Sequence, residues 1–152
     1  EERLFSQGCK TFILDGDNVR HGLNKDLGFS NADRVENIRR ISEVAKLFVD
    51  AGLIVIVSFI SPFKKERAFA RSLVEKNEFI EVFVKCPVSI CEQRDVKGLY
   101  AKARKGEIKN FIGIDIDYEE PKNAEIMLET DKSDIQTSVL QIFNYLKSKK
   151  VI

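Results

Sequence analysis

The feature of this sequence that most constrains its fold is the alternation of short apolar runs with longer segments of helical periodicity. The run at residues 54–60, IVIVSFI, is β-branched and nearly continuous, as in a parallel strand buried on both faces. Strands that alternate with helices indicate βαβ units. We therefore predict a three-layer α/β domain with a mainly parallel sheet and right-handed crossovers. The predicted strands are residues 11–14, 54–60, 79–85 and 126–128.

Helix boundaries are marked by local signals. Ser30 and Asp33 have the spacing of a capping box, so a helix is predicted to begin at Ser30. Pro62 suits the first turn of a second helix that runs to about residue 75. Asp134 is predicted to begin the last helix, where a negative charge is favoured by the helix dipole.

Composition limits the class of protein. The length of 152 residues favours one domain, and we predict a single domain over residues 1–152. A net charge of +1 argues against a nucleic-acid or membrane-surface binder. Three scattered cysteines and no signal-peptide pattern favour a reducing, cytoplasmic location. A single histidine excludes a multi-histidine metal site.

Polar and charged residues follow the predicted strands. Ligands of open α/β sheets collect at the carboxyl ends of strands. Asp15 to Leu23, DGDNVRHGL, follows the first strand, and Ser61 follows the second. Arg20 and Arg34 could therefore converge on one anionic ligand, leaving Asp15 and Asp17 for a magnesium ion or a hydroxyl. The alternatives are a plain turn at Asp15 and surface arginines.

A basic segment departs from the neutral composition. Residues 94–109 hold six Lys and Arg against two acids, and Gly98 and Gly106 bracket residues 99–105. Such a segment suits a mobile lid over an anionic ligand. A solvated basic helix is the alternative, and the sequence alone leaves both open.

Several longer motifs closely resemble adenylyl-sulfate kinase. They are DGDNVRHGLNKDLGFS (15–30), DRVENIRRISEVAKLFVDAG (33–52), FISPF (59–63), CEQRDVKGLYAKARKGEIKNFIGID (91–115) and DYEEP (117–121). That family transfers the ATP γ-phosphate to the 3′-hydroxyl of adenosine 5′-phosphosulfate (APS), giving 3′-phosphoadenosine 5′-phosphosulfate in sulfate assimilation. The resemblance implies a P-loop-kinase-like fold with a basic lid at residues 94–118, ATP as co-substrate, and magnesium. Nucleotide partners and a homodimer are implied as well.

The resemblance also implies roles for individual residues. Phe29 and Phe111 are expected on opposite faces of the substrate's adenine. Catalysis is implied for Asp17, Ser61 and Lys97, ATP binding for Arg94 and Ser133, and magnesium binding for Asp15 and Asp17. Substrate binding is implied for Asp17, Asn18, Arg20, Phe29, Arg34, Asn37, Ile60, Ser61, Lys97, Asn110 and Phe111.

Two departures from the family pattern stand out. Asn110 and Ile112 stand where the family's KGFTG has glycine and threonine. The phosphate-binding pattern G-x-x-x-x-G-K-[ST] does not occur, since none of the eight glycines precedes a lysine. A chain that begins at Glu1 is therefore expected to have little kinase activity, as a truncated kinase or part of a longer sequence. The alternatives are a catalytically silent nucleotide-binding domain and another small-molecule kinase.

Overall fold

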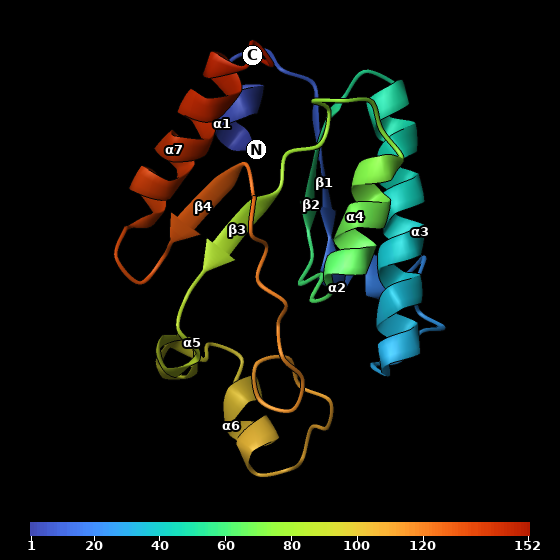
Figure 1. Ribbon diagram of the computed structural model, residues 1–152, viewed down its shortest axis with the longest axis vertical. Helices are drawn as coiled ribbons and strands as arrows, with labels where there is room; N and C mark the ends of the chain where they lie inside the picture. The colour runs from blue at the N-terminus through green and yellow to red at the C-terminus, as the bar shows by residue number, and fades with distance from the viewer. The chain divides into compact units, whose positions relative to one another are not determined.

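The computed structural model describes residues 1–152 as two units, Glu1–Phe79 and Ile80–Ile152. Each unit contains one two-stranded parallel sheet (Figure 1). The α/β class and the parallel pairing of the strands are thereby confirmed. The single domain over residues 1–152 stays a prediction.

The first unit is built around the parallel pair of β1 and β2. Thr11 lies opposite Ile54, and Asp15 lies opposite Ser58. Helix α3 packs on both strands, and α4 packs beside α3 (Figure 1). The elements are α1 (Glu2–Phe5), β1 (Thr11–Asp15), α2 (Gly16–His21), α3 (Asn31–Asp50), β2 (Ile54–Ser58) and α4 (Lys64–Ser72).

The core of this unit lies between the sheet and α3. Leu14, Ile38 and Ile41 are buried together, and Ile41 is only 1% exposed. Phe48 packs against this cluster and also stacks on Phe12, with 4.7 Å between ring centroids. The apolar stripe of α3 thus holds the helix on the strands.

The capping box predicted for α3 is present. The Ser30 hydroxyl accepts a hydrogen bond from the Asp33 N–H at 3.1 Å, and Asp33 Oδ2 accepts one from the Ser30 N–H at 3.3 Å. These bonds satisfy donors that a helix start leaves unpaired. The loop from Gly28 to Ser30 is therefore attached firmly to the first turn of α3.

The second unit pairs β3 with β4. Val82 lies opposite Ile126, and Lys85 lies opposite Glu129. Helix α7 contacts β4, while α5 and α6 follow the carboxyl end of β3 (Figure 1). The elements are β3 (Val82–Lys85), α5 (Val88–Arg94), α6 (Leu99–Arg104), β4 (Ile126–Glu129) and α7 (Ile135–Ser148). Its buried apolar residues are Phe83, Ala103, Ile126, Leu128, Phe143 and Leu146.

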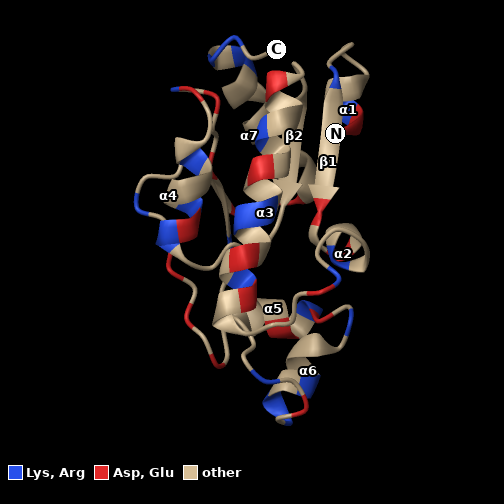
Figure 2. Cartoon of the chain, turned by 90° about the vertical axis from the view of Figure 1, so that its right-hand side faces the viewer, with Lys and Arg blue, Asp and Glu red and all other residues tan.

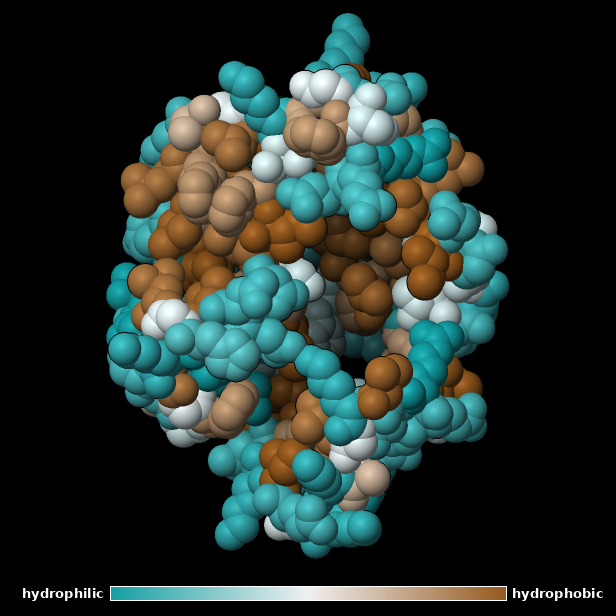
Figure 3. Space-filling model, turned by 180° about the vertical axis from the view of Figure 1, so that it is seen from behind, coloured by the Kyte–Doolittle hydropathy of each residue, from teal (hydrophilic) through white to brown (hydrophobic).

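Three local expectations need correction. The strand predicted at residues 79–85 begins only at Val82. The second predicted helix is shorter than expected, because Phe63 is its N-cap and it ends at Ser72. The run at residues 54–60 is a strand only as far as Ser58, and Val57 remains 44% exposed. Hydrophobic residues, brown in Figure 3, are visible at the surface of the molecule.

No helix in the structure is both long enough and apolar enough to span a bilayer. Cys9, Cys86 and Cys91 are all free thiols.

Ion pairs line the outer side of α3, where acidic and basic bands alternate (Figure 2). Glu36 accepts hydrogen bonds from Arg39 at 2.7 Å and from Arg40 at 2.8 Å. Arg40 also donates to Asp26 at 2.7 Å, which ties the loop before α3 to the helix. The Arg39 and Arg40 bonds lower the pKa of Glu36 from 4.5 to about 2.

We predict that Glu36→Gln lowers the free energy of unfolding at neutral pH. Because the folded-state pKa of Glu36 is depressed, its contribution is present above about 4.5 and is lost as the pH falls toward about 2. Urea unfolding at pH 7 and at pH 2.5 measures the difference between variant and unaltered chain. Glu43→Gln, on the same helix, is the control. A Glu36→Gln difference that persists unchanged at pH 2.5 would contradict the prediction.

Candidate functional site

The carboxyl ends of β1 and β2 bring two predicted site loops to one edge of the sheet. Asp15 Oδ1 accepts hydrogen bonds from the N–H groups of Asp17 at 3.0 Å and Asn18 at 3.3 Å, and so caps α2. At Gly16, a Cβ atom would lie 3.4 Å from the Ser58 carbonyl oxygen. The start of α2 therefore lies within ordinary contact distance of the end of β2.

Arg20, Phe29 and Arg34 form one cluster in the first unit. The guanidinium carbons of Arg20 and Arg34 lie 4.4 Å and 5.7 Å from the Phe29 ring centroid. Arg20 also donates to the carbonyl oxygens of Gly28 at 2.9 Å and Leu27 at 3.3 Å. Phe29 is 60% exposed, so its ring is accessible as a stacking surface.

The charges of this cluster favour an anionic ligand. Partial burial lowers the pKa of Arg34, and the nearby positive charge of Arg20 lowers it further. Both guanidinium groups still carry their charge at neutral pH. Two cations held at one ring repel each other, and an anion bound between them relieves that repulsion. The cluster is therefore suited to a phosphate or sulfate group.

Asn37 lies deeper than expected for a residue that contacts a ligand. It is 5% exposed, and its Oδ1 accepts a hydrogen bond from Nδ2 of Asn24 at 2.9 Å. Asn24 is fully buried, and its own Oδ1 has no hydrogen-bond partner. The Asn24–Asn37 bond therefore anchors the loop before Gly28 to α3.

The loop after β2 holds Ile60 and Ser61. Ile60 is 61% exposed, whereas Ser61 is half-buried and has a φ of 37°. The Ser61 carbonyl oxygen accepts a hydrogen bond of 2.7 Å from Nη1 of Arg67. Arg67, in α4, is 7% exposed.

In the second unit, the basic segment at residues 94–109 contains the short helix α6, which has a hydrogen-bonded start and a glycine on either side. The Asp95 carboxylate accepts hydrogen bonds from the N–H groups of Tyr100 at 3.1 Å and Ala101 at 3.0 Å. Gly98 and Gly106, with φ of 66° and 76°, allow the chain to turn on either side of α6. The lysines and arginines of α6 appear in blue in Figure 2. Lys102 and Arg104 of this helix are exposed, so the lid and the solvated basic helix both remain open as predictions.

Phe111 and Asn110 lie in the loop that follows α6. The Phe111 ring packs edge-on against Tyr100, with centroids 5.0 Å apart. Burial, followed by the neighbouring Cys91, raises the pKa of Tyr100 to about 12. Asn110 has a φ of 58°, a conformation that asparagine adopts more readily than most residues other than glycine. The replacement of the family's glycine at this position is thereby explained. Lys97 and Asn110 are both exposed.

The two predicted ATP residues belong to neighbouring parts of the second unit. Arg94 donates to the carbonyl oxygen of Thr130 at 2.6 Å, and its other amino group lies 3.8 Å from Sγ of Cys86. Ser133 follows three residues after Thr130, and its hydroxyl donates to the Glu129 carbonyl at 3.0 Å. Arg94 is therefore attached to the loop that carries Ser133.

The magnesium site at Asp15 and Asp17 stays a prediction. No group of three or more His, Cys, Asp or Glu side chains is placed to hold a metal ion. Asp15 uses one carboxylate oxygen to cap α2. Magnesium in kinases is held largely by nucleotide phosphates with one or two carboxylates, and Asp17 in the first turn of α2 fits that role.

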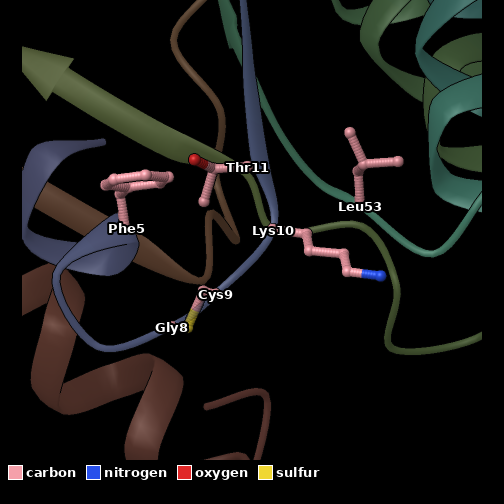
Figure 4. Close-up of a pocket in the computed structure, with 6 residues that line it drawn as sticks. All are labelled: Phe5, Gly8, Cys9, Lys10, Thr11 and Leu53. Atoms are coloured by element: carbon pink, nitrogen blue, oxygen red, sulfur yellow. The ribbon is translucent and has the colours of Figure 1, made fainter.

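An open pocket of about 480 Å³ lies at the opposite edge of the first sheet, where β1 begins (Figure 4). Its lining residues are Phe5, Gly8, Cys9, Lys10, Thr11 and Leu53. None of them is a predicted site residue. The pocket is therefore separate from the edge that carries the Arg20–Phe29–Arg34 cluster.

Sequence reasoning missed Asn24 and Arg67. Asn24 lies within the motif at residues 15–30 but has no assigned role there, and Arg67 lies outside the motifs quoted above. The only signal at Arg67 is its spacing of four residues from Arg71, which is equally typical of a solvated helix face. Only the burial of these side chains in the structure reveals them.

The fold is that of an α/β protein, and the Arg20–Phe29–Arg34 cluster suited to an anion belongs to the unit built on the parallel strands β1 and β2. The family profile for adenylylsulphate kinase matches residues 1–129. This chain belongs to the adenylyl-sulfate kinase family, a family of kinases that transfer phosphate from ATP.

Relatives of known identity agree over the whole chain. The probable adenylyl-sulfate kinase of Bacillus subtilis is 53% identical over 152 residues, which are 100% of this chain and 76% of that protein. The adenylyl-sulfate kinase of Staphylococcus epidermidis is 58% identical with the same coverage, 100% and 76%. A solved structure of Mycobacterium tuberculosis APS kinase, in complex with AMPPNP and APS, superposes with a TM-score of 0.89 at 47% identity. That match covers 97% of this chain and 86% of the other.

We predict that Asn37→Ala destabilises the first unit by about 1–3 kcal/mol, because it leaves the buried Asn24 amide without a partner. Urea unfolding measures the loss. The double variant Asn24→Ala/Asn37→Ala is expected to lose less than the sum of the two single variants. Asn144→Ala, at an exposed position in α7, is the control. Strict additivity would show that the two amides do not depend on each other.

Proposed function

We propose that this chain binds adenosine 5′-phosphosulfate through the Arg20–Phe29–Arg34 cluster and directs its 3′-hydroxyl to the γ-phosphate of ATP. The observation that carries the proposal is the pair of guanidinium groups held at one exposed aromatic ring. A nucleotide that carries a phosphosulfate offers both an anion for the arginines and a base for the ring. The M. tuberculosis relative in complex with AMPPNP and APS supports this pair of ligands.

The remaining residues of the first unit complete the proposed acceptor site. Asp17 and Asn18 begin α2 at the same edge, and Ile60 and Ser61 follow β2. Asn37 acts through its bond to Asn24, which fixes the loop that leads to Phe29. From the second unit, Lys97, Asn110 and Phe111 are proposed to contact the acceptor, and Arg94 and Ser133 to contact ATP.

The proposed reaction is an in-line phosphoryl transfer. The 3′-hydroxyl oxygen forms a bond to the γ-phosphorus while the bond from that phosphorus to the β,γ-bridging oxygen breaks, and ADP leaves. Asp17 is the carboxylate proposed to accept the hydroxyl proton. Lys97 is proposed to stabilise the negative charge on the transferring group, and Ser61 to position the acceptor. Magnesium, when bound with ATP, neutralises phosphate charge.

The proposed setting is the cytoplasm, since the three cysteines are free thiols as expected in a reducing compartment. A homodimer is part of the proposal, because oligomers occur among related kinases. An APS kinase of Thiobacillus denitrificans described as hexameric is 28% identical and superposes with a TM-score of 0.70.

We predict that Arg34→Lys weakens APS binding to the full chain by about 1–3 kcal/mol, because a lysine cannot make two parallel hydrogen bonds to one anion. Isothermal titration with APS measures the affinity. Arg20 is left unaltered in this test, because it also holds the carbonyl groups of Leu27 and Gly28.

The control for this prediction is Arg39→Lys, an exposed position on the same helix that pairs with Glu36. Its APS affinity is expected to equal that of the unaltered chain. Equal losses in Arg34→Lys and Arg39→Lys would place the phosphosulfate elsewhere. Absence of APS binding to the unaltered chain would overturn the proposed function.

We predict that Phe29→Ala and Phe111→Ala each weaken APS binding by about 1–3 kcal/mol, the range for an aromatic ring stacked on a base. Phe29→Ala is expected to leave the melting temperature nearly unchanged, since the ring is 60% exposed. The two losses are expected to be non-additive if both rings hold the same adenine. Phe5→Ala, at a ring 73% exposed, is the control. A lowered melting temperature with unchanged APS affinity would make these rings structural.

A further inference from the structure

We propose that Arg67 is a positioning residue, whose buried guanidinium holds the Ile60–Ser61 turn in the shape that receives the acceptor nucleotide. The inference rests on the proposed function and assigns a role to a residue outside the family motifs described above. Arg67 lies in α4, and its Nη1 donates to the Ser61 carbonyl oxygen at 2.7 Å. No contact between Arg67 and the ligand is part of this role.

The backbone at Ser61 needs support. Its φ of 37° lies in the left-handed region, which a residue with a side chain adopts only at an energetic cost. Ser61 also precedes Pro62, whose ring restricts the conformation of the residue before it. A conformation of this kind persists when surrounding groups enforce it. The hydrogen bond from Arg67 is the interaction that fixes the Ser61 carbonyl.

The orientation of that carbonyl decides which groups remain for a ligand. With its oxygen bonded to Arg67, Ser61 retains its N–H and its hydroxyl, neither of which has a hydrogen-bond partner within the chain. Ile60, immediately before it, is 61% exposed. A change in the orientation of the Ser61 carbonyl would therefore also redirect the Ser61 N–H and hydroxyl groups.

Burial of Arg67 shows that the guanidinium is not a solvated surface charge. The residue is 7% exposed, and an apolar side chain of similar length would occupy the same space without a desolvation cost. A buried cation directed at a strained carbonyl is what a positioning role requires.

The same helix supplies a matched control. Arg71 lies one turn later, donates to the Phe79 carbonyl oxygen at 3.4 Å and lies 4.6 Å from the Phe79 ring centroid. It therefore shares with Arg67 the residue type, the helix and a bond to a backbone carbonyl. It differs in that its carbonyl lies outside the proposed site.

The test compares three variants of the full chain: Arg67→Met, Arg67→Lys and Arg71→Met. APS affinity is measured by isothermal titration, and stability by thermal unfolding. Arg67→Met is expected to weaken APS binding about tenfold, because it removes the charge-assisted hydrogen bond to the Ser61 carbonyl. Arg67→Lys keeps a donor and a charge, so its loss is expected to be no more than about threefold. Arg71→Met is expected to bind APS as tightly as the unaltered chain.

The two readouts separate positioning from a purely structural role. Burial of methionine costs less desolvation than burial of lysine, so Arg67→Met is expected to be at least as stable as Arg67→Lys while binding APS more weakly. Affinity that simply follows stability across the variants overturns the inference. An unchanged affinity in Arg67→Met, or an equal loss in Arg71→Met, also overturns it.

Failure of the variants to fold and failure of the unaltered chain to bind APS are separate outcomes. Arg67→Gln is tested alongside, because it keeps one donor on a neutral side chain. Failure of both Arg67→Met and Arg67→Gln to fold overturns the positioning role in favour of a structural one. Failure of the unaltered chain to bind APS overturns the proposed function itself, and the role of Arg67 with it.

Discussion

The parallel register of β1 and β2 is the constraint on which the candidate acceptor site depends. Because Asp15 lies opposite Ser58, the segments that leave the two strands emerge at the same edge of the sheet. One begins α2 with Asp17 and Asn18, and the other carries Ile60 and Ser61. A register shifted by one residue would turn Leu14 away from the core and move both segments. The apolar contacts of α3 with the strands therefore also determine the geometry of the site.

Arginines stabilise the loops around this edge before any ligand binds. Arg20 holds the carbonyl groups of Leu27 and Gly28, Arg40 holds Asp26, and Arg67 holds the Ser61 carbonyl. Each guanidinium thus fixes a segment that has no regular secondary structure. Folding also brings Arg34 near Arg20 despite their like charges. Since the repulsion is already present in the folded chain, an anionic ligand gains affinity by relieving it.

Much of the local structure could be predicted from the sequence. The strand predicted at residues 54–60, the Ser30–Asp33 capping box and the Asp134 cap depend on neighbours within a few residues. Both caps are present, and the strand is present as far as Ser58. The predicted end of the second helix, near residue 75, was wrong, because the helix ends at Ser72. Helix ends depend on weak competing signals, and Asn77 with a φ of 79° belongs to the turn that follows.

The sequence by itself determined the α/β class, the order of the elements and which loops carry charge, because hydrophobic periodicity and capping are local properties of the chain. It also contained the motifs that resemble the adenylyl-sulfate kinase family. Only the tertiary structure decided that Asn24 is buried against Asn37 and that Arg67 bonds to Ser61. Burial of a polar side chain depends on packing between segments distant in sequence, and no local pattern encodes the partner that such a side chain finds.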